Sequence, residues 1–189
     1  MTRCFMQNLR LHFPQGTIAA TAWIAPNATV LGDVTIADQA SVWFQSVIRG
    51  DVESIRIGCG TNIQDLCVLH ADEGFPCLIG ARVTVGHAAI VHGAVVEDDV
   101  MIGMRAVVMN GARIGSGSIV GVGSIVTEGT IVPPGSVVLG VPAKIKRPVE
   151  TRDRDRIRHA AEHYIRAAEA YRLHFTAGQP AAARIDPHP

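Results

Sequence analysis

Aliphatic residues recur every six positions along most of the chain. The repeat runs through Ile79, Val85 and Val91, shifts by one residue, and continues at Val96, Ile102, Val108, Ile114, Val120, Val126, Val132 and Val138. A glycine often follows directly, as at Gly80, Gly86, Gly103, Gly115 and Gly121. A period of six fits neither the 3.6 residues of a helical turn nor the alternation of a simple strand. It predicts short strands joined by turns and coiled repeatedly.

Three such hexapeptides would complete one triangular coil of about 18 residues, so the repeat predicts an all-β fold, a parallel β-helix. The aliphatic residues are expected to point inward and stack, and the glycines beside them are expected to serve turn geometry that a Cβ would strain. The repeat is less regular in residues 21–48, where it passes through Val30, Ile36, Val42 and Ile48. We assign residues 1–148 to the β-helix domain.

Residues 149–175 have a different pattern, with apolar residues at steps of three and four positions from Ile157 to Phe175. This spacing predicts an amphipathic C-terminal α-helix that packs along the β-helix. Residues 176–189 are rich in alanine and proline, and we expect a disordered tail there.

Composition narrows the function classes. The 189 residues are 48% hydrophobic but only 5% aromatic, which suits an aliphatic interior of stacked coils. The formal net charge is zero, so no basic surface indicates nucleic acid as a partner. No apolar run reaches the roughly 18 residues of a membrane span, and the first residues lack the apolar core of a signal peptide. We therefore expect a cytoplasmic protein that does not bind membranes.

Three histidines within the repeat are candidate metal ligands. His70 and His87 are 17 residues apart, close to one coil, so the spacing places them on neighbouring coils at nearly the same corner. His87 and His92 are five apart, which separates them by one face of the prism. A compact site containing all three would need a second subunit. Three histidines with one open position form the ligand set of a catalytic zinc site.

Other polar residues accompany these histidines. Arg49-Gly50-Asp51 favours an ion-pair network over adhesion, since Gln64 and Asp65 follow about one coil later. The loop at residues 71–77 interrupts the repeat, and its Asp72 and Glu73 suit either a solvated loop tip or the mouth of a site. Trp43 and Phe44 are expected to pack rather than bind substrate. His12, His159, His163, His174 and His188 are not expected to bind metal.

Taken together, the motifs resemble those of the gamma-class carbonic anhydrases and their close bacterial homologues, over roughly residues 10–175. They are Arg49-Gly50-Asp51, Asn62-Ile63-Gln64-Asp65, His70, Val85-Gly86-His87 and Val91-His92-Gly93. The resemblance implies a homotrimer of left-handed β-helices with metal sites between subunits. It further implies that His70 and His92 come from one chain and His87 from its neighbour.

The resemblance also implies the chemistry. A Zn²⁺ ion, or Fe²⁺ or Co²⁺ in its place, would hold a hydroxide that attacks CO₂ and yields bicarbonate. Gln64 would orient the metal-bound water, Asp51 would support Gln64 through hydrogen bonds, and Asn62 and Tyr164 would lie at the site. Arg49 and Asp65 would form an ion pair between subunits.

Two features differ from the archetype of that family. Val52 follows Asp51 where the archetype has a glutamate, and the acidic loop at residues 71–77 is short, so the route of proton transfer stays open. Three other functions also stay open. They are a metal-hydroxide hydrolase such as a CoA thioesterase, a hexapeptide acyltransferase, and a non-catalytic scaffold protein.

Overall fold

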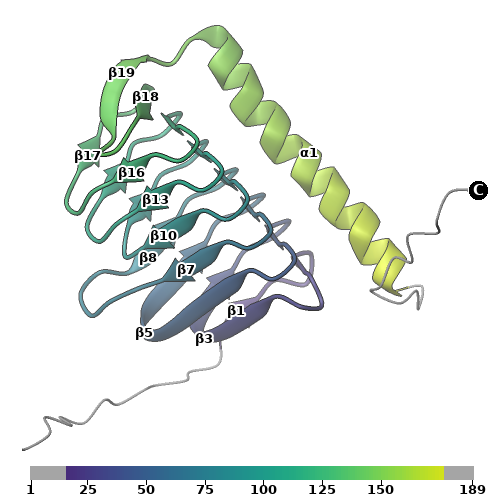
Figure 1. The fold of residues 1–189 in the computed structure, drawn as a ribbon. Helices are drawn as coiled ribbons and strands as arrows, with labels where there is room; N and C mark the ends of the chain where they lie inside the picture. Colours follow the sequence, from purple (N-terminus) through teal and green to yellow (C-terminus); the bar gives the residue numbers. More distant parts are fainter. Residues whose placement is uncertain (1–15, 177–189) are drawn as a thin grey trace, which may run out of the picture.

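The chain forms a parallel β-helix flanked by one long helix (Figure 1). This computed structural model describes residues 16–176, so His12 and His188 lie outside the described residues, as does the expected tail apart from Thr176, the last residue of the helix. The confirmed fold class follows from the six-residue repeat. Every aliphatic residue of that repeat from Ile79 to Val138 is buried in one continuous core.

The strands stack into three faces. The first contains β5 (Val47–Ile57), β7 (Val68–His70), β10 (Ile90–His92), β13 (Val107–Val108) and β16 (Ile125–Val126). The long β5 turns a corner and also begins the second, with β8 (Cys77–Ile79), β11 (Val95–Val96), β14 (Arg113–Ile114) and β17 (Ile131–Val132). The third contains β2 (Trp23–Ile24), β4 (Ser41–Val42), β6 (Asn62–Ile63), β9 (Thr84–Val85), β12 (Met101–Ile102), β15 (Ile119–Val120), β18 (Ser136–Leu139) and β19 (Lys144–Pro148).

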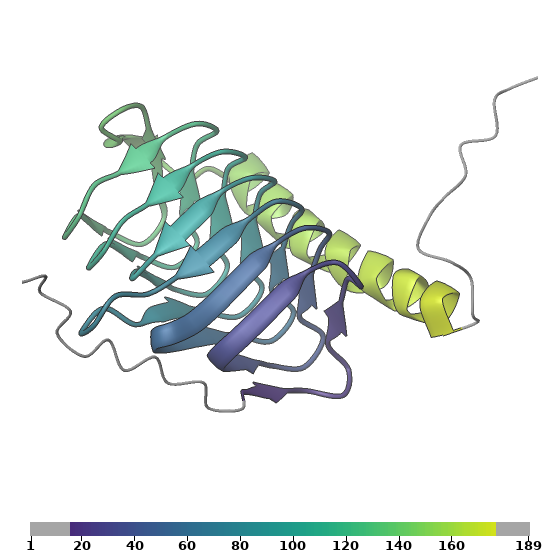
Figure 2. The ribbon, with the colours of Figure 1, turned by 60° about the horizontal axis from the view of Figure 1, so that its bottom comes forward.

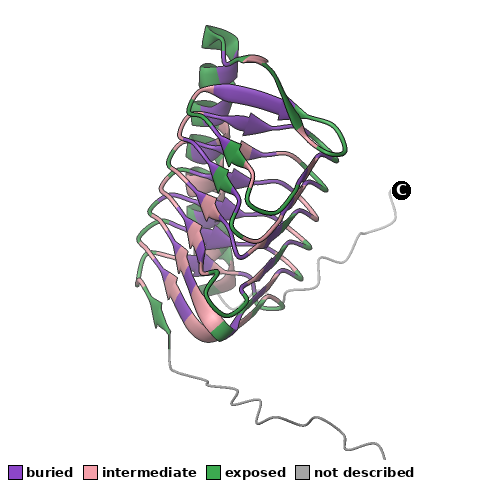
Figure 3. Cartoon of the chain, turned by 90° about the vertical axis from the view of Figure 1, so that its left-hand side faces the viewer, coloured by how far each residue is buried: buried purple, intermediate pink, exposed green. Residues whose placement is uncertain are grey.

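The two ends of the prism are built differently. At the start of the chain, β1 (Thr17–Ile18) pairs with β3 (Thr29–Ile36), and β3 pairs in parallel with β5. At the far end, β19 runs antiparallel to β18 and leads into the helix. Figure 2 shows the coils stacked from β1 to this end. Buried, intermediate and exposed residues alternate around the coils (Figure 3).

Coil length varies along the prism, and this variation positions the site. An ordinary coil pairs Met101 with Ile119, eighteen residues later. The coil that contains the loop at residues 71–77 is longer, because it pairs Val68 with Ile90, twenty-two residues later. Residues that face one another across this coil are therefore four positions further apart in the sequence than the repeat predicts.

The glycines that follow the aliphatic residues are required for a reason other than the expected one. A Cβ at Gly103 would lie 2.6 Å from the backbone nitrogen of Val122 in the next coil, so these glycines allow close stacking of backbones. The left-handed turn falls two positions later. Glycine occupies it in the later coils, at Gly111, Gly117, Gly123, Gly129 and Gly135, and in one earlier coil, at Gly60. The other earlier coils have Gln39, Gln45, Leu66, Arg82, Ala88, Asp99 and Arg105 there.

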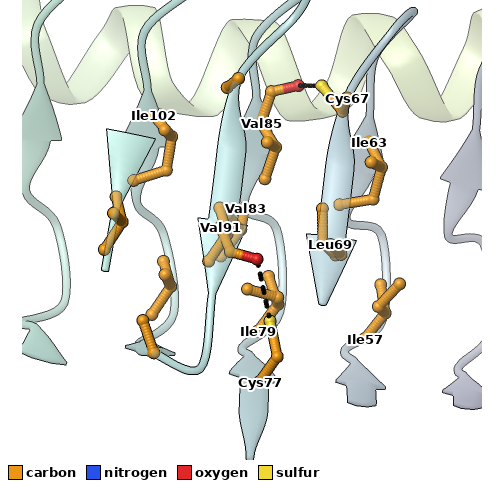
Figure 4. Close-up of a cluster of buried hydrophobic side chains, with 14 of the residues drawn as sticks. Ile57, Ile63, Cys67, Leu69, Cys77, Ile79, Val83, Val85, Val91 and Ile102 are labelled. Carbon is orange, nitrogen blue, oxygen red and sulfur yellow. Dashed lines mark hydrogen bonds between the residues drawn. The ribbon is translucent and has the colours of Figure 1, made fainter. Parts of the chain in front are cut away.

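Two cysteines complete the aliphatic interior (Figure 4). The Cys67 thiol donates to the carbonyl oxygen of Gly86 at 3.2 Å, and the Cys77 thiol lies 3.8 Å from the carbonyl oxygen of Val91. Burial raises the pKa of each thiol from 9.0 to about 12, because the thiolate would lack solvation inside the core.

The helix α1 (Thr151–Thr176) lies along the third face and contacts β2, β4, β6 and β9. An aromatic cluster fills this contact: Trp43 packs edge-on against Tyr164 with ring centroids 5.1 Å apart, and Trp23 packs against Trp43 and Tyr171. Trp43 is thus a packing residue, as expected. Within residues 16–176, no helix is long and apolar enough to cross a membrane.

Candidate metal centre

Two of the three candidate histidines face each other on the first face. His70 ends β7 and His92 ends β10, and the two residues are paired in the strand register. The Nδ1 atom of His70 lies 2.9 Å from Nε2 of His92. The prediction that His70 and His87 share a corner is therefore wrong. The longer coil between the strands places His92, rather than His87, beside His70.

Asp51 forms a hydrogen bond with Nε2 of His70, the outer ring nitrogen, which faces away from His92. The Nε2 atom of His70 lies 3.1 Å from Oδ1 of Asp51, and Arg49 donates to the same oxygen from Nη1 at 2.7 Å. Burial favours the neutral carboxyl, but the hydrogen bonds from Arg49 and His70 outweigh it, so the pKa of Asp51 lies below its usual value. An ionised carboxylate only accepts hydrogen bonds. His70 therefore donates from Nε2 and carries its lone pair on Nδ1.

Asn110 holds the outer nitrogen of His92. Its Oδ1 lies 2.6 Å from Nδ1 of His92, and its Nδ2 donates to Oδ2 of Asp72 at 2.8 Å. An amide oxygen only accepts, so His92 donates from Nδ1 and carries its lone pair on Nε2.

In their neutral forms, His70 and His92 therefore direct their lone pairs at each other, an arrangement that a bound cation stabilises. Among residues 16–176, the groups close enough to hold a metal together are His70, His92 and the carboxylate of Asp72, whose ligand atoms lie within 4.8 Å of one another. Paired neutral imidazoles, each held by an outer hydrogen bond, are the donor set of a transition-metal site.

His87 lies at a different corner, in the turn between β9 and β10. Its Nδ1 lies 2.8 Å from Oδ2 of Asp65, and its backbone nitrogen donates to Oε1 of Gln64 at 3.1 Å. The Tyr164 hydroxyl oxygen is 3.4 Å from Nε2 of His87. Burial, together with the nearby charge of Asp65, raises the pKa of Tyr164 above its usual value. Gln64 in turn donates from Nε2 to Oδ1 of Asn62 at 3.1 Å.

The sequence-predicted residues therefore form two groups in one chain. The first is Arg49, Asp51, His70 and His92; the second is Asn62, Gln64, Asp65, His87 and Tyr164. Within the described chain, Arg49 pairs with Asp51, and Gln64 bonds to Asn62 and His87 rather than to Asp51. The ion pair between Arg49 and Asp65 is expected between subunits and stays a prediction.

Sequence reasoning missed Asn110. A signal was available, because Asn110 follows His92 by eighteen residues, the length of an ordinary coil. A polar residue at this spacing lies beside the ligand on the next coil. The loop residue Asp72 also faces the site, which decides between the two alternatives left open for it.

The face between the two groups is apolar and exposed. Val68 in β7 is 37% exposed and Ile90 in β10 is also 37% exposed. Leu66, Met104 and Val122, at the corner that holds His87, are more exposed still. A contiguous apolar surface of this kind is typical of a protein–protein interface.

Comparisons with known proteins agree with the repeat architecture. A family model described as bacterial transferase hexapeptide (six repeats) matches residues 93–128. A solved Bacillus cereus protein described as a "putative acetyltransferase" superposes with a TM-score of 0.81 at 37% identity, covering 83% of this chain and 91% of the other.

Several curated relatives are named as carbonic anhydrases. The chain is 45% identical over 152 residues to a Methanocaldococcus jannaschii protein named "Probable carbonic anhydrase", covering 80% of this chain and 96% of that protein. It is 40% identical over 155 residues to the mitochondrial gamma carbonic anhydrase 2 of Arabidopsis thaliana, covering 79% of this chain and 56% of the plant protein.

Proposed function

Because this chain belongs to the gamma-class carbonic anhydrase family, we propose that it hydrates CO₂ reversibly to bicarbonate at a metal centre shared between subunits. The observation that carries the proposal is the 2.9 Å approach of Nδ1 of His70 to Nε2 of His92, both with lone pairs directed inward. Two such lone pairs repel each other at this distance, and a cation bound between the nitrogens relieves that repulsion. The family relationship to carbonic anhydrases favours a metal ion as that cation.

His70 and His92 of one chain and His87 of a neighbouring chain would hold the metal. Imidazole nitrogens suit Zn²⁺, and also Fe²⁺ and Co²⁺. A metal held by these three histidines would supply Lewis acidity, making water acidic enough to serve as the nucleophile toward CO₂ near neutral pH.

The chain's own residues orient these ligands. Asp51 accepts from His70, and Asp65 accepts from Nδ1 of His87, so each carboxylate directs the other ring nitrogen toward the centre. Gln64 is held at both ends, because its amide nitrogen donates to Asn62 and its oxygen accepts from His87. We propose that this fixed amide orients the attacking water, with Asn62 and Tyr164 bordering the same site.

A homotrimer would bring the two groups together. His87 lies at the corner before β10, and His92 lies at the end of β10, so the exposed apolar face carries one group at each edge. Association around a three-fold axis would cover Val68 and Ile90 and place His87 of one chain beside His70 and His92 of the next. Arg49 and Asp65 would then be near enough to form the ion pair between subunits.

The principal alternative is acyl transfer. It is favoured by the solved Bacillus cereus protein described as an acetyltransferase, which is 37% identical to this chain. An acyltransferase needs an acyl donor, so calorimetric titration with acetyl-CoA separates the two functions. The anhydrase proposal expects no binding.

The direct test is CO₂ hydration followed by stopped flow, on protein loaded with Zn²⁺ or, without oxygen, with Fe²⁺. We expect His87→Ala to lose more activity than the 10–100-fold that removal of an outer hydrogen-bond partner costs. His159→Ala, which changes an exposed histidine on α1, is the matched control and should keep wild-type activity. A metal-loaded wild type no faster than His87→Ala would refute the proposal.

A further inference from the structure

We propose that Asn110 is a positioning residue: it fixes the tautomer of His92 and ties the loop at residues 71–77 to that ligand. The inference rests on the proposed function insofar as His92 is taken to be a metal ligand. The two hydrogen bonds that run from Asp72 through Asn110 to His92, called the relay below, require no metal.

The fold gives Asn110 a dedicated place. Asn110 follows β13 at the corner one coil beyond His92, and its side chain reaches back over Gly93. A Cβ on Gly93 would lie 2.3 Å from Oδ1 of Asn110, so only glycine at this position leaves room for the amide. Gly93 also has a positive φ of 53°, which glycine adopts freely.

The relay has a defined direction because its outer end is a carboxylate. Asp72 only accepts, so the amide nitrogen of Asn110 must face it, at 2.8 Å. The amide oxygen must then face Nδ1 of His92, at 2.6 Å, and that nitrogen must carry the proton. The second oxygen of Asp72 is 3.9 Å from Nε2 of His92, too far to accept a hydrogen bond, so it does not compete.

The same relay holds the loop. Asp72 and Phe75 close the loop through a β-bridge. The Phe75 side chain lies over glycines of two successive coils, since a Cβ on Gly93 would be 2.9 Å from Cβ of Phe75 and one on Gly111 would be 3.3 Å from its ring atom Cε1. Asn110 therefore links a loop at the mouth of the centre to the orientation of one ligand.

The first test reads the tautomer of His92 in metal-free protein by ¹⁵N NMR of labelled histidines. Spectra are recorded at about pH 8.5, above the reference histidine pKa of about 6.5, and the His92 signals are assigned by their loss in His92→Gln. We expect the proton on Nδ1 in the wild type and in Asn110→Asp, because a carboxylate still accepts there. Asn110→Leu should lose this preference. Asp72→Asn should give a mixture, since a neutral amide no longer forces the direction of the relay.

The second test measures Zn²⁺ affinity by competition with a chelating dye. Loss of an outer partner weakens metal binding by about 10–100-fold, so we expect that change for Asn110→Leu and rescue by Asn110→Asp. The matched control is Asn27→Leu, which removes another asparagine that accepts a hydrogen bond from a neighbouring coil, from Gln45. That variant should keep wild-type affinity.

The outcomes separate this proposal from the proposed function. A wild-type His92 with its proton on Nε2, or an unchanged tautomer in Asn110→Leu, would overturn the relay whatever the enzyme's activity. A wild type that shows the expected tautomer and the expected variant pattern, but does not hydrate CO₂, would support the relay and refute only the anhydrase activity.

Discussion

His87 and Asp65 are joined across adjacent coils, with Nδ1 of His87 2.8 Å from Oδ2 of Asp65, at the corner where the first face begins. The same face ends at the corner of His70 and His92. Because Asp65 occupies Nδ1, Nε2 is the ring nitrogen of His87 left to bind a metal; it lies 3.4 Å from the Tyr164 hydroxyl, and the His87 side chain is 44% exposed. One chain thus carries the two residue groups of the proposed centre on opposite edges of an exposed apolar face.

Mixing two inactive variants tests whether these halves belong to different subunits. His87→Ala and His92→Ala should each lack activity alone. After unfolding and refolding together in equal amounts, about one quarter of the interfaces should pair an intact His87 with an intact His70 and His92, and about a quarter of wild-type activity should return. The control mixes His70→Ala with His92→Ala, which damage the same half. Recovery in that control, or none in the first mixture, would contradict a shared centre.

A charge on the exposed apolar face should prevent assembly. Ile90→Asp would bury an unpaired carboxylate in the proposed interface, so we expect a monomer by light scattering and loss of CO₂ hydration. Ile131→Asp is the matched control, because Ile131 is 64% exposed but lies on the second face, in β17. It should remain a trimer with normal activity. An active, trimeric Ile90→Asp would place the interface elsewhere.

The two classes of glycine should respond differently to alanine. Gly103→Ala drives a Cβ to 2.6 Å from the Val122 backbone, which cannot move without separating two coils, so we expect a loss of several kcal/mol in the free energy of unfolding. Gly117→Ala meets no atom within 4 Å and has only a φ of 65° to tolerate, at a cost of about 1–2 kcal/mol. Urea midpoints at one protein concentration would compare them, and equal losses would contradict the distinction.

The buried thiols predict an alkaline limit to stability. Cys67 and Cys77 have pKa values of about 12 when folded and 9.0 as the reference for the unfolded chain. Between these values the unfolded chain has released protons that the folded protein keeps, so stability falls as pH rises from about 9 toward 12. Urea unfolding of Cys67→Ala/Cys77→Ala across this range should show a smaller relative fall. A fall as steep as that of the wild type would contradict the burial argument.

Thiol labelling offers an independent check. In a Cys4→Ser background at pH 8, exposed Cys59 should react with a disulfide reagent, while Cys67 and Cys77 should react only after unfolding. Rapid labelling of all three in the native protein would show that the core opens.

The sequence by itself determined which residues point inward. The six-residue repeat predicts a buried, stacked row because neighbouring coils place equivalent positions on one another, and residues such as Val85, Ile102 and Val120 occupy such a row. The motifs also identified His70, His87 and His92 and most of their polar neighbours. Local periodicity is sufficient for this, since the direction of a side chain depends on its place within a single repeat.

Only the tertiary structure decided which of these residues meet. Stacking partners depend on the length of each coil, and the loop at residues 71–77 adds four residues to one coil, which brings His92 rather than His87 to His70. The same dependence hid Asn110, whose role appears only when its coil is placed over His92. The separation of His87 from the other two histidines follows from the shape of a prism, whose rigid faces keep side chains on different edges apart.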